Sequence, residues 1–428
     1  MALLIGIVLL LIALLGAPLF AVILTSAIIG FSQSDIDLSV IAIEIYRLAE
    51  MPVLLAIPLF TLAGYILGES QAPKRLVRIS NVILGWMPGG LAIVALAACA
   101  LFTAFTGASG VTIVALGALL YPAMKQAGYP EKFNLGLITT AGSLGLLFAP
   151  SLPLILYAVV AQQMTLDQPV NIDDLFIAGI FPGLLMLVLL SAWAAWKHRK
   201  HWGRNDVKWS LQEAKDAVID AAWELPLPFV ILGGIYGGYI AVSEAAALTA
   251  FYVLIVEVFI RREISLPQLP KIIRESMIMV GGIMIILGAS LASTNYMIDA
   301  EIPTKVFEAV REHIDSKLTF LILLNIFLLV LGMMLDIFSA IVIMIPLILP
   351  IAIGYGIHPL HLGIIFLANM QLGYFTPPVG MNLFIASYRF EKPVWELCKA
   401  TIPFFIILLF AVLIITYWPG LSLMLLAG

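Results

Sequence analysis

Residues 135–157 read LGLITTAGSLGLLFAPSLPLILY, and residues 362–384 read LGIIFLANMQLGYFTPPVGMNLF. Each stretch starts as an apolar helix with Leu-Gly at its head and is then interrupted by glycine and proline. The interruptions fall at Gly142, Gly145 and Pro150 in the first stretch and at Gly373, Pro377, Pro378 and Gly380 in the second. Unpaired backbone groups are costly in hydrocarbon, so breaks at membrane depth must line a protein-enclosed site. Paired breaks in corresponding halves are the sequence pattern of a transporter's binding site.

The composition is that of a membrane protein. Of 428 residues, 62% are hydrophobic and 11% are charged, which predicts an all-α polytopic membrane protein. The lipid bilayer is therefore an expected partner, and nucleic acid is not. Cys99 and Cys398 lie in apolar surroundings and predict no disulfide. The first basic residue is Arg47, so we expect residues 3–16 to be a retained helix rather than a cleaved signal peptide.

Apolar runs predict five crossings in each half of the chain. In the first half they are residues 3–16, 18–31, 52–68, 133–162 and 176–196, and in the second half 226–241, 244–260, 276–294, 360–386 and 401–418. Between the third and fourth crossings lie residues 88–122 and 319–350, each too long for one span. We expect each to be a re-entrant helical hairpin, with a turn near Gly107 or Asp336 and an end at Pro122 or Pro350.

Five crossings is an odd number, so the second half must enter from the opposite side and the two repeats are inverted. The predicted organisation is repeat 1 over 1–200, a cytoplasmic linker over 201–223 and repeat 2 over 224–428. Within the repeats, residues 1–70 and 224–294 form scaffold helices, and 133–162 and 360–386 are broken helices. Two amphipathic stretches, 38–50 and 267–275, either lie along the interface or are buried connectors.

The charges agree with this topology. Loops that the inversion places on one face carry Lys74, Arg75, Arg78, Lys125, Lys132, Lys197, Arg199, Lys200, Arg204, Lys208, Arg261, Arg262, Arg389, Lys392 and Lys399. Loops 32–39 and 163–175, on the other face, carry aspartates and no basic residue. By the positive-inside rule the basic face is cytoplasmic, and both termini are periplasmic. Segment 295–318 is an exception, with both signs of charge on the outer face.

The first hairpin tip carries the densest group of polar residues: Thr103, Thr106, Gly107, Ser109, Gly110 and Thr112. We expect Ser109 to cap the return half-helix, whose free N–H groups suit a carboxylate. Carbonyls at the end of the incoming half-helix suit Na⁺. The alternative is that these small residues only allow close helix packing.

Asp336 lies in the second tip, where a carboxylate is costly unless it is paired. We favour Na⁺ as its partner, with Ser339 nearby, over a salt bridge to another helix. Oxygen ligands at the two breaks are Ser143, Ser151, Asn369, Thr376 and Asn382. Glu44, Arg47 and Glu50 are expected to pair with each other on one helix. Glu244 and Glu257 are expected to contact other helices or a partner subunit.

Other functions are less well supported. His198-x-x-His201 and His358-x-x-His361 lack further ligands at zinc spacing. Gly107-Ala108-Ser109-Gly110 fits an intramembrane serine protease pattern, but all five histidines lie in loops or at helix ends. A channel does not need opposed hairpins. The chain has no Walker A loop, so transport is secondary, with sodium favoured over proton as the coupling ion. No other metal and no organic cofactor is expected.

The chain resembles the large membrane subunit of TRAP (tripartite ATP-independent periplasmic) transporters, the DctM-like family. The resemblance rests on FTAFTGASGVTIVALGALLYPAM (102–124), GSLGLLFAPSLPLILY (142–157), LGYFTPPVGMNLF (372–384) and IPLFTLAGYILGES (57–70). It implies an elevator-type, sodium-coupled importer in the bacterial inner membrane. It also implies a small four-helix membrane subunit and a periplasmic substrate-binding protein.

The resemblance implies a small organic anion with a carboxylate as substrate, such as a C4-dicarboxylate, sialic acid, a keto acid or a sulfonate. It implies one sodium at the first tip and break and a second at Asp336 and the second break. Residues expected at the substrate are Ser109, Thr112, Ser151, Asn369 and Asn382. Residues expected at sodium are Thr106, Gly107, Ser109, Gly142, Ser143, Asp336, Ser339, Gly373 and Thr376.

Overall fold

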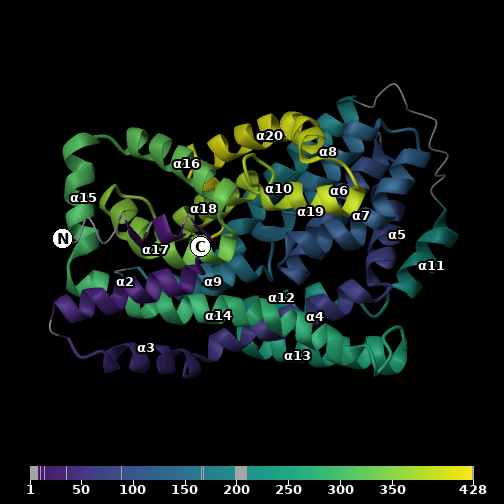
Figure 1. The fold of residues 1–428 in the computed structure, drawn as a ribbon. Helices are drawn as coiled ribbons and strands as arrows, with labels where there is room; N and C mark the ends of the chain where they lie inside the picture. The colour runs from purple at the N-terminus through teal and green to yellow at the C-terminus, as the bar shows by residue number, and fades with distance from the viewer. Residues whose placement is uncertain are drawn as a thin grey trace.

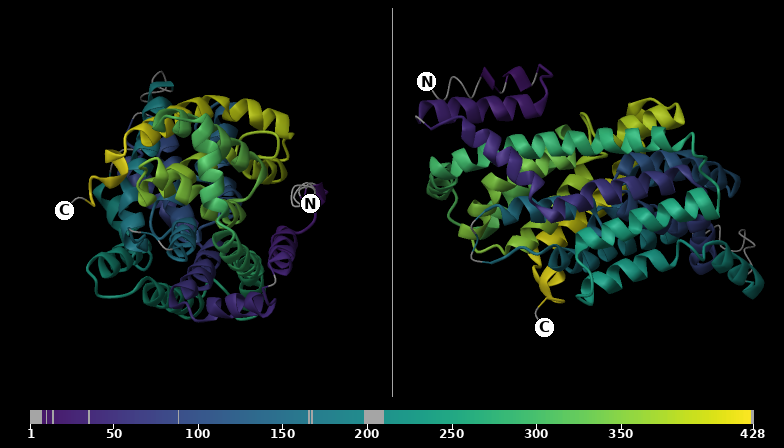
Figure 2. Two further views of the ribbon diagram at one scale, coloured as in Figure 1. Left: turned by 90° about the vertical axis from the view of Figure 1, so that its left-hand side faces the viewer. Right: turned by 90° about the horizontal axis from the view of Figure 1, so that it is seen from below.

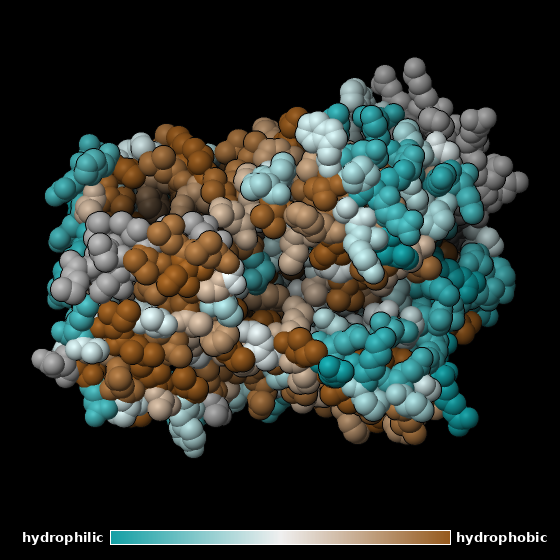
Figure 3. Space-filling model, viewed as in Figure 1, coloured by the Kyte–Doolittle hydropathy of each residue, from teal (hydrophilic) through white to brown (hydrophobic). Residues whose placement is uncertain are grey.

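The chain forms an elongated bundle whose helices mostly run along its long axis (Figure 1). This computed structural model describes residues 8–426 except 10, 14, 35, 88, 165, 167 and 198–209. Every regular element in these residues is a helix, which confirms the all-α prediction. Hydrophilic side chains gather at the two ends of the axis, and hydrophobic ones lie between them on the face in Figure 3. The predicted crossing 3–16 and linker 201–223 lie partly outside the described residues, and His198 and His201 lie wholly outside.

Seven described segments are long and apolar enough to cross a membrane. They are η1–α4 (Pro52–Leu55, Ala56–Glu69), α10 (Ile172–Lys197), α13–η4 (Val242–Leu254, Ile255–Ile260), α14 (Leu269–Asp299), α16 (Lys317–Met334), α17 (Ile337–Gly354) and α20 (Val394–Tyr417). A bent pair, Glu131–Leu147 with Leu152–Gln162, is an eighth if counted as one span. The sequence predicts ten crossings. Five of the seven segments and the bent pair match predicted crossings, whereas α16 and α17 are the arms of the predicted second hairpin. The predicted crossings 18–31, 226–241 and 360–386 contain shorter apolar helices, and 3–16 lies partly outside the described residues; a full span needs about 20 residues.

Two helical hairpins are present where the sequence predicts them. The first is α6 (Gly90–Thr106) and α7 (Ser109–Gln126), and the second is α16 and α17. Neither proline ends its hairpin, because Pro122 and Pro350 lie inside the last turns of α7 and α17. A proline removes only its own N–H from the ladder, and Ala127 N–H still reaches Ala123 O. Both arms of the second hairpin are long enough to span, so length alone does not make it re-entrant.

Both broken helices are interrupted close to the predicted positions. The first consists of α8 (Glu131–Ala141), the 3₁₀ turn η2 (Leu144–Leu147) and α9 (Leu152–Gln162). The second consists of α18 (Pro359–Gly373) and α19 (Met381–Phe390). Each connector contains a cis X-Pro bond, at Ala149–Pro150 and at Pro377–Pro378. These connectors and the two hairpin tips lie in the middle of the bundle (Figure 1).

The scaffold helices form a layer along one side of the bundle, seen end-on in Figure 2 (left). This layer contains α2 (Leu19–Gln33), α3 (Ser39–Ala49), α4, α12 (Pro226–Tyr236), α13 and α14. Within it α4 packs on α13 and α14 packs on α2. The helix α5 (Ala72–Leu84) leads from α4 to the first hairpin and packs on α6. The layer touches the bundle mainly through α4 against α6 and α14 against α17.

Several connecting segments differ from the sequence-based expectation. Residues 267–275 are not a separate interfacial stretch, because α14 runs unbroken from Leu269 to Asp299. Pro270 in its first turn favours a helix start, and no later proline stops it. Segment 295–318, predicted to lie outside, contains an amphipathic helix, α15 (Ile302–His313), and the predicted linker contains α11 (Leu211–Asp220). In α3 Arg47 pairs with Glu44 at 3.1 Å, as expected, but Glu50 forms no ion pair with the described residues.

Close helix packing inside the bundle depends on glycine. In α8, a Cβ at Gly136 would collide with the Ala400 carbonyl oxygen and the Phe404 ring of α20. Gly363 of α18 lies against the Tyr157 ring of α9, and a Cβ there would be 2.7 Å from it. These contacts hold the broken helices against neighbours from the opposite half of the chain.

We predict that Gly136→Ala destabilises the protein by about 1–3 kcal/mol, because overpacking forces α8 away from the α20 backbone. The measurement is the free energy of unfolding in detergent. Gly282→Ala in α14 is the matched control, since nothing lies within 4 Å of the position that an added Cβ would occupy. A helical Gly→Ala change without a clash gains up to about 1 kcal/mol. Equal effects of the two substitutions would contradict this account of the α8–α20 contact.

Candidate functional site

The first hairpin tip is held together by hydroxyl groups. Gly107 ends α6 in the left-handed region, with φ of 65°, and the chain turns back at once into α7. Thr103 Oγ1 donates to Gly142 O at 2.9 Å and lies 2.7 Å from Thr112 Oγ1. All four residues are buried. The tip is therefore tied directly to a carbonyl that the first helix break has freed.

Ser109 does not cap α7, which corrects the expectation from the sequence. Ala108 occupies the cap position in extended conformation, and Ser109 is the first helical residue. Its side chain is buried, and no described residue forms a hydrogen bond with its Oγ. Thr106 is also buried, and its Oγ1 is 3.5 Å from Ala108 O. The tip thus holds a hydroxyl that is enclosed by protein and remains unused.

The first break uses two serines. Ser143 Oγ lies 3.3 Å from Thr140 O and 3.4 Å from Gln371 O, and its single proton can serve only one of them at a time. Ser151 Oγ donates to Leu146 O at 2.6 Å, just before α9 begins. Both serines are fully buried. They satisfy carbonyls that have left the helical ladder.

The second tip is organised by Asp336. Its Oδ1 accepts from the N–H groups of Phe338 and Ser339, each at 3.0 Å, which caps α17. Ser339 Oγ donates to Asp336 Oδ2 at 2.5 Å. Tyr374, at the second break, accepts from Ile337 N–H through its hydroxyl at 2.7 Å. Asp336 is half-buried and forms no salt bridge within the described residues, so its charge is held by hydrogen bonds alone.

The second break packs backbone against backbone. Gly373 lies so close to Gly332 of α16 that a Cβ at position 373 would collide with the Gly332 main chain. Three hydrogen bonds use groups near the break: Gly380 N–H to Met333 O at 3.1 Å, Asn382 N–H to Tyr374 O at 2.8 Å and Thr376 Oγ1 to Leu372 O at 2.7 Å. Residues 377–379 are exposed, so this break is the more open of the two.

The two breaks are joined to each other. Asn382 Nδ2 donates to Thr139 O at 3.1 Å, and Ser143 Oγ approaches Gln371 O. A side chain at each break thus reaches a main-chain carbonyl at the other. The structure brings Ser109, Thr112, Gly142, Ser143 and Asn382 into one connected group, and Asp336, Ser339, Gly373 and Thr376 into a second.

Several buried polar atoms without a hydrogen-bond partner lie near the junction, the region where the two breaks meet. Such atoms in the described residues include Ser109 Oγ, Thr140 Oγ1, Asn382 Oδ1 and both amide atoms of Gln371. Buried polar atoms are normally paired, so these atoms are available to a ligand that enters the junction. Thr140 and Gln371 are absent from the sequence-based site. Both are polar and stand just before the glycine of a break, a signal that could have identified them.

Asn369 and His361 belong to a separate buried network. Asn369 Nδ2 donates to Asn325 Oδ1 at 2.7 Å, and Thr416 Oγ1 donates to the same oxygen at 3.0 Å. His361 lies in the first turn of α18, at a helix end as expected, and is buried. Its Nε2 is 3.3 Å from Thr416 O and its Nδ1 is 3.2 Å from Ser422 Oγ, so both ring nitrogens have partners. Asn369 Oδ1 alone lacks a partner.

No described group of three or more His, Cys, Asp or Glu side chains has the arrangement of a metal site. A protease needs a base against its serine, and no described side chain contacts Ser109 Oγ through a hydrogen bond. What the junction offers is a set of enclosed oxygen atoms, together with a hydrogen-bonded carboxylate at the second tip.

A family model for the tripartite ATP-independent periplasmic transporter, DctM component, matches residues 3–421. The chain belongs to this family. The resemblance seen in the sequence is thereby confirmed, and members of this kind are transporter permeases rather than enzymes. The chain is 34% identical over 401 residues to the C4-dicarboxylate TRAP transporter large permease protein DctM of Rhodobacter capsulatus, covering 92% of this chain and 91% of that protein.

Other relatives have different named substrates. The ectoine/5-hydroxyectoine TRAP transporter large permease protein UehC of Ruegeria pomeroyi is 32% identical over 419 residues, covering 96% of this chain and 95% of UehC. The isethionate TRAP transporter permease protein DctMQ of Oleidesulfovibrio alaskensis is 35% identical over 371 residues, which cover 86% of this chain and 57% of that protein. The solved YdaH transporter of Alcanivorax borkumensis has the same fold, with a TM-score of 0.63 at 14% identity, covering 89% of this chain and 87% of YdaH.

We predict that Tyr374→Phe loosens the second hairpin tip, because Ile337 N–H loses its acceptor in a buried position. Leaving a buried donor unpaired costs about 1–3 kcal/mol. The measurement is hydrogen–deuterium exchange, which should become faster in the peptide that covers residues 335–339. Tyr388→Phe is the control, since Tyr388 is 90% exposed. Unchanged exchange in Tyr374→Phe would show that this hydrogen bond does not hold the tip.

Proposed function

We propose that this chain is the permease of a sodium-coupled importer of a small, carboxylate-bearing organic anion. In this proposal it acts in the bacterial inner membrane with a small four-helix membrane subunit and a periplasmic substrate-binding protein. The observation that carries the proposal is the set of enclosed, unpaired oxygen atoms between two broken helices. Membership of the TRAP family and the substrates in the names of its relatives support the same conclusion.

Reciprocal packing supports two inverted repeats. In the predicted order of crossings, α4 corresponds to α14 and α2 corresponds to α13. The α4–α13 contact therefore has its counterpart in the α14–α2 contact. Where α8 packs on α20, α18 packs on α10. Where α9 packs on α17, α19 packs on α7. Each pair is the other with the halves exchanged, as a two-fold axis through the junction requires.

The distribution of helices supports an elevator-type movement. The hairpins and broken helices interlock in one bundle, while the scaffold layer touches that bundle mainly through α4 and α14. In the proposal, the bundle moves as a unit along this contact. The end with α5 and α11 is cytoplasmic and the end with α15 is periplasmic, as the positive-inside rule favours. Both termini are then periplasmic.

Sodium is the coupling ion that best suits the donors. Hydroxyl and amide oxygens in an unwound region are ligands of the kind that bind Na⁺ in secondary transporters. At the first site we propose Ser109, Ser143, Thr106 and carbonyls near Gly107 and Gly142. At the second we propose Asp336, Ser339, Thr376 and carbonyls near Gly373. For the substrate carboxylate we propose Ser109, Thr112, Ser151 and Asn382, and the start of α7 adds partial positive charge. Asn369, which the sequence also suggests, is bonded to Asn325 in the separate network.

We predict that Asp336→Asn raises the sodium concentration for half-maximal uptake by at least tenfold, a loss of about 1.4 kcal/mol of binding free energy. Asparagine is also a good N-cap, so α17 keeps its cap while the charge is lost. The measurement is uptake into proteoliposomes that contain the complete transporter, at varied sodium gradients. The control is Ser316→Ala, which removes the exposed cap of α16 far from the junction.

Uptake driven by a pH gradient and indifferent to sodium would contradict the sodium assignment and favour proton coupling. Unaltered sodium dependence in Asp336→Asn would remove Asp336 from the site while leaving the function intact. Identifying the ligand of the cognate binding protein would establish which anion is carried.

A further inference from the structure

A buried group of charges lies at the start of α5, away from the helix breaks. Arg75 in the first turn of α5 is 5% exposed. Its guanidinium contacts three carboxylates: Glu263 at 2.5 Å, Glu224 at 2.5 Å and Glu257 at 3.5 Å. Glu257 is fully buried and Glu224 is 6% exposed. One positive charge therefore faces three acidic groups in a place that water barely reaches.

The local backbone brings Glu257 and Glu263 together. Residues 255–260 form a single π-helical turn, η4, at the end of α13. Arg262 then adopts a left-handed conformation with φ of 55°, and the chain folds back. Glu263 N–H donates to Glu257 O at 2.9 Å as a result. Both side chains lie against the same Arg75 guanidinium.

The available donors serve Glu263 and not Glu257. Glu263 accepts from Arg75 at both oxygens and from Gln71 N–H at 2.7 Å. Burial raises the pKa of Glu263, but these hydrogen bonds more than offset it, so that this pKa lies below its ordinary value. Neither Glu257 oxygen accepts a hydrogen bond from any N–H or O–H of the described residues. Glu263 is thus a carboxylate, and its neighbour Glu257 has no donor.

Other charged and polar groups nearby are engaged elsewhere. Arg261 binds the carbonyl and carboxylate of Asp220. Arg78, on the next turn of α5 after Arg75, pairs with Glu213 and Asp220 of α11. The Tyr252 hydroxyl donates to Trp223 O at 2.8 Å. Among the described residues, Arg75 at 3.5 Å is the one cation within 4 Å of the Glu257 carboxylate.

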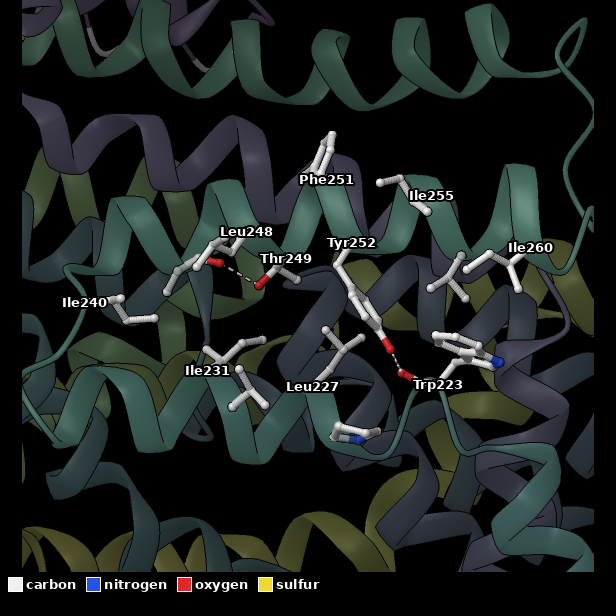
Figure 4. A pocket seen from close by; sticks show the side chains of 14 residues that line it. Trp223, Leu227, Ile231, Ile240, Leu248, Thr249, Phe251, Tyr252, Ile255 and Ile260 are labelled. Carbon is white, nitrogen blue, oxygen red and sulfur yellow. Dashed lines mark hydrogen bonds between the residues drawn. The ribbon is translucent and has the colours of Figure 1, made fainter.

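Apolar cavities flank the group on two sides. One, of about 400 Å³, lies between α12 and α13 and is lined by Trp223, Leu227, Tyr252 and Ile260 (Figure 4). Another, of about 360 Å³, lies between α5, α6 and α12 and includes Glu224 in its wall. Apolar surroundings of this kind disfavour a second adjacent carboxylate, because an unpaired buried charge is costly.

We infer that Glu257 is a proton-binding site: its protonated carboxyl group donates to the Glu263 carboxylate, and this shared proton fastens the start of α5 to the end of α13. With this proton in place, the group has one positive charge, on Arg75, and two negative charges, on Glu224 and Glu263. Without the proton it has three negative charges. Loss of the proton would leave two carboxylates in contact and weaken the attachment of α5. Because α5 leads into the first hairpin, the joint links proton concentration to the support of that hairpin.

The sign of the pH effect follows from proton counting. The folded protein holds a proton on Glu257 that the unfolded chain releases above the ordinary glutamate pKa of about 4.3. Stability is therefore greatest at low pH and is lost as pH rises, by up to tenfold in the folding equilibrium per pH unit.

The test compares thermal unfolding of the full chain in lipid nanodiscs from about pH 5 to about pH 9, a range above the ordinary glutamate pKa. We expect the midpoint of the wild type to fall with rising pH. In Glu257→Gln the amide donates to Glu263 at every pH, so the fall should be abolished or strongly reduced. Glu224→Gln is the matched control: it removes an equal charge from the same arginine but keeps the acid pair, and should retain the pH dependence.

Infrared spectroscopy supplies a direct readout. The C=O stretch of a protonated carboxyl group should be present in the wild type and in Glu224→Gln and missing in Glu257→Gln. If Glu257→Gln does not fold, Glu257→Asp serves instead, and should shift that band. A wild-type pH slope retained in Glu257→Gln, or an acid band unaffected by these changes at 257, would overturn the inference. The inference would also be overturned if the thermal unfolding midpoint changed when sodium replaced choline but did not change with pH.

Discussion

Backbone groups released by a helix break in the middle of a membrane protein must find partners inside the protein, and the rest of this structure depends on how they do so. Thr103 supplies a hydroxyl to the Gly142 carbonyl, and Tyr374 supplies an oxygen to the Ile337 N–H. Each bond connects a hairpin tip to the helix break in the same half of the chain. A tip and its break are therefore one mechanical element in each half.

The two halves solve this problem with different chemistry. The first tip uses threonine hydroxyls and leaves Ser109 Oγ unpaired, whereas the second uses a carboxylate that caps α17. The first break is enclosed, and residues 377–379 of the second are exposed. If both halves bind a cation, the half with the formal negative charge provides the stronger attraction. The two halves are accordingly more alike in their backbone than in the polar side chains that they place at the tips and breaks.

Much of the fold could be predicted, because interrupted apolar helices and two-residue turns leave clear signals in sequence. The positions of both hairpins and both breaks follow from glycine, proline and run length. The role of Ser109 at the start of α7 could not be predicted, because the cap depends on the backbone angles of Ala108. Burial of His361 was missed because its partners, Thr416 and Ser422, are distant in sequence. Pairing of Glu257 with Glu263 depends on the π-helical turn, which no simple periodicity reveals.

The joint between the two breaks has an evolutionary consequence. Asn382 and Ser143 supply the side chains, while positions 139 and 371 supply only main-chain carbonyls. Every amino acid has a main-chain carbonyl, so a substitution at 139 or 371 changes the side chain and keeps the hydrogen-bond acceptor. Selection for these two hydrogen bonds therefore acts on the donor side chains of Asn382 and Ser143.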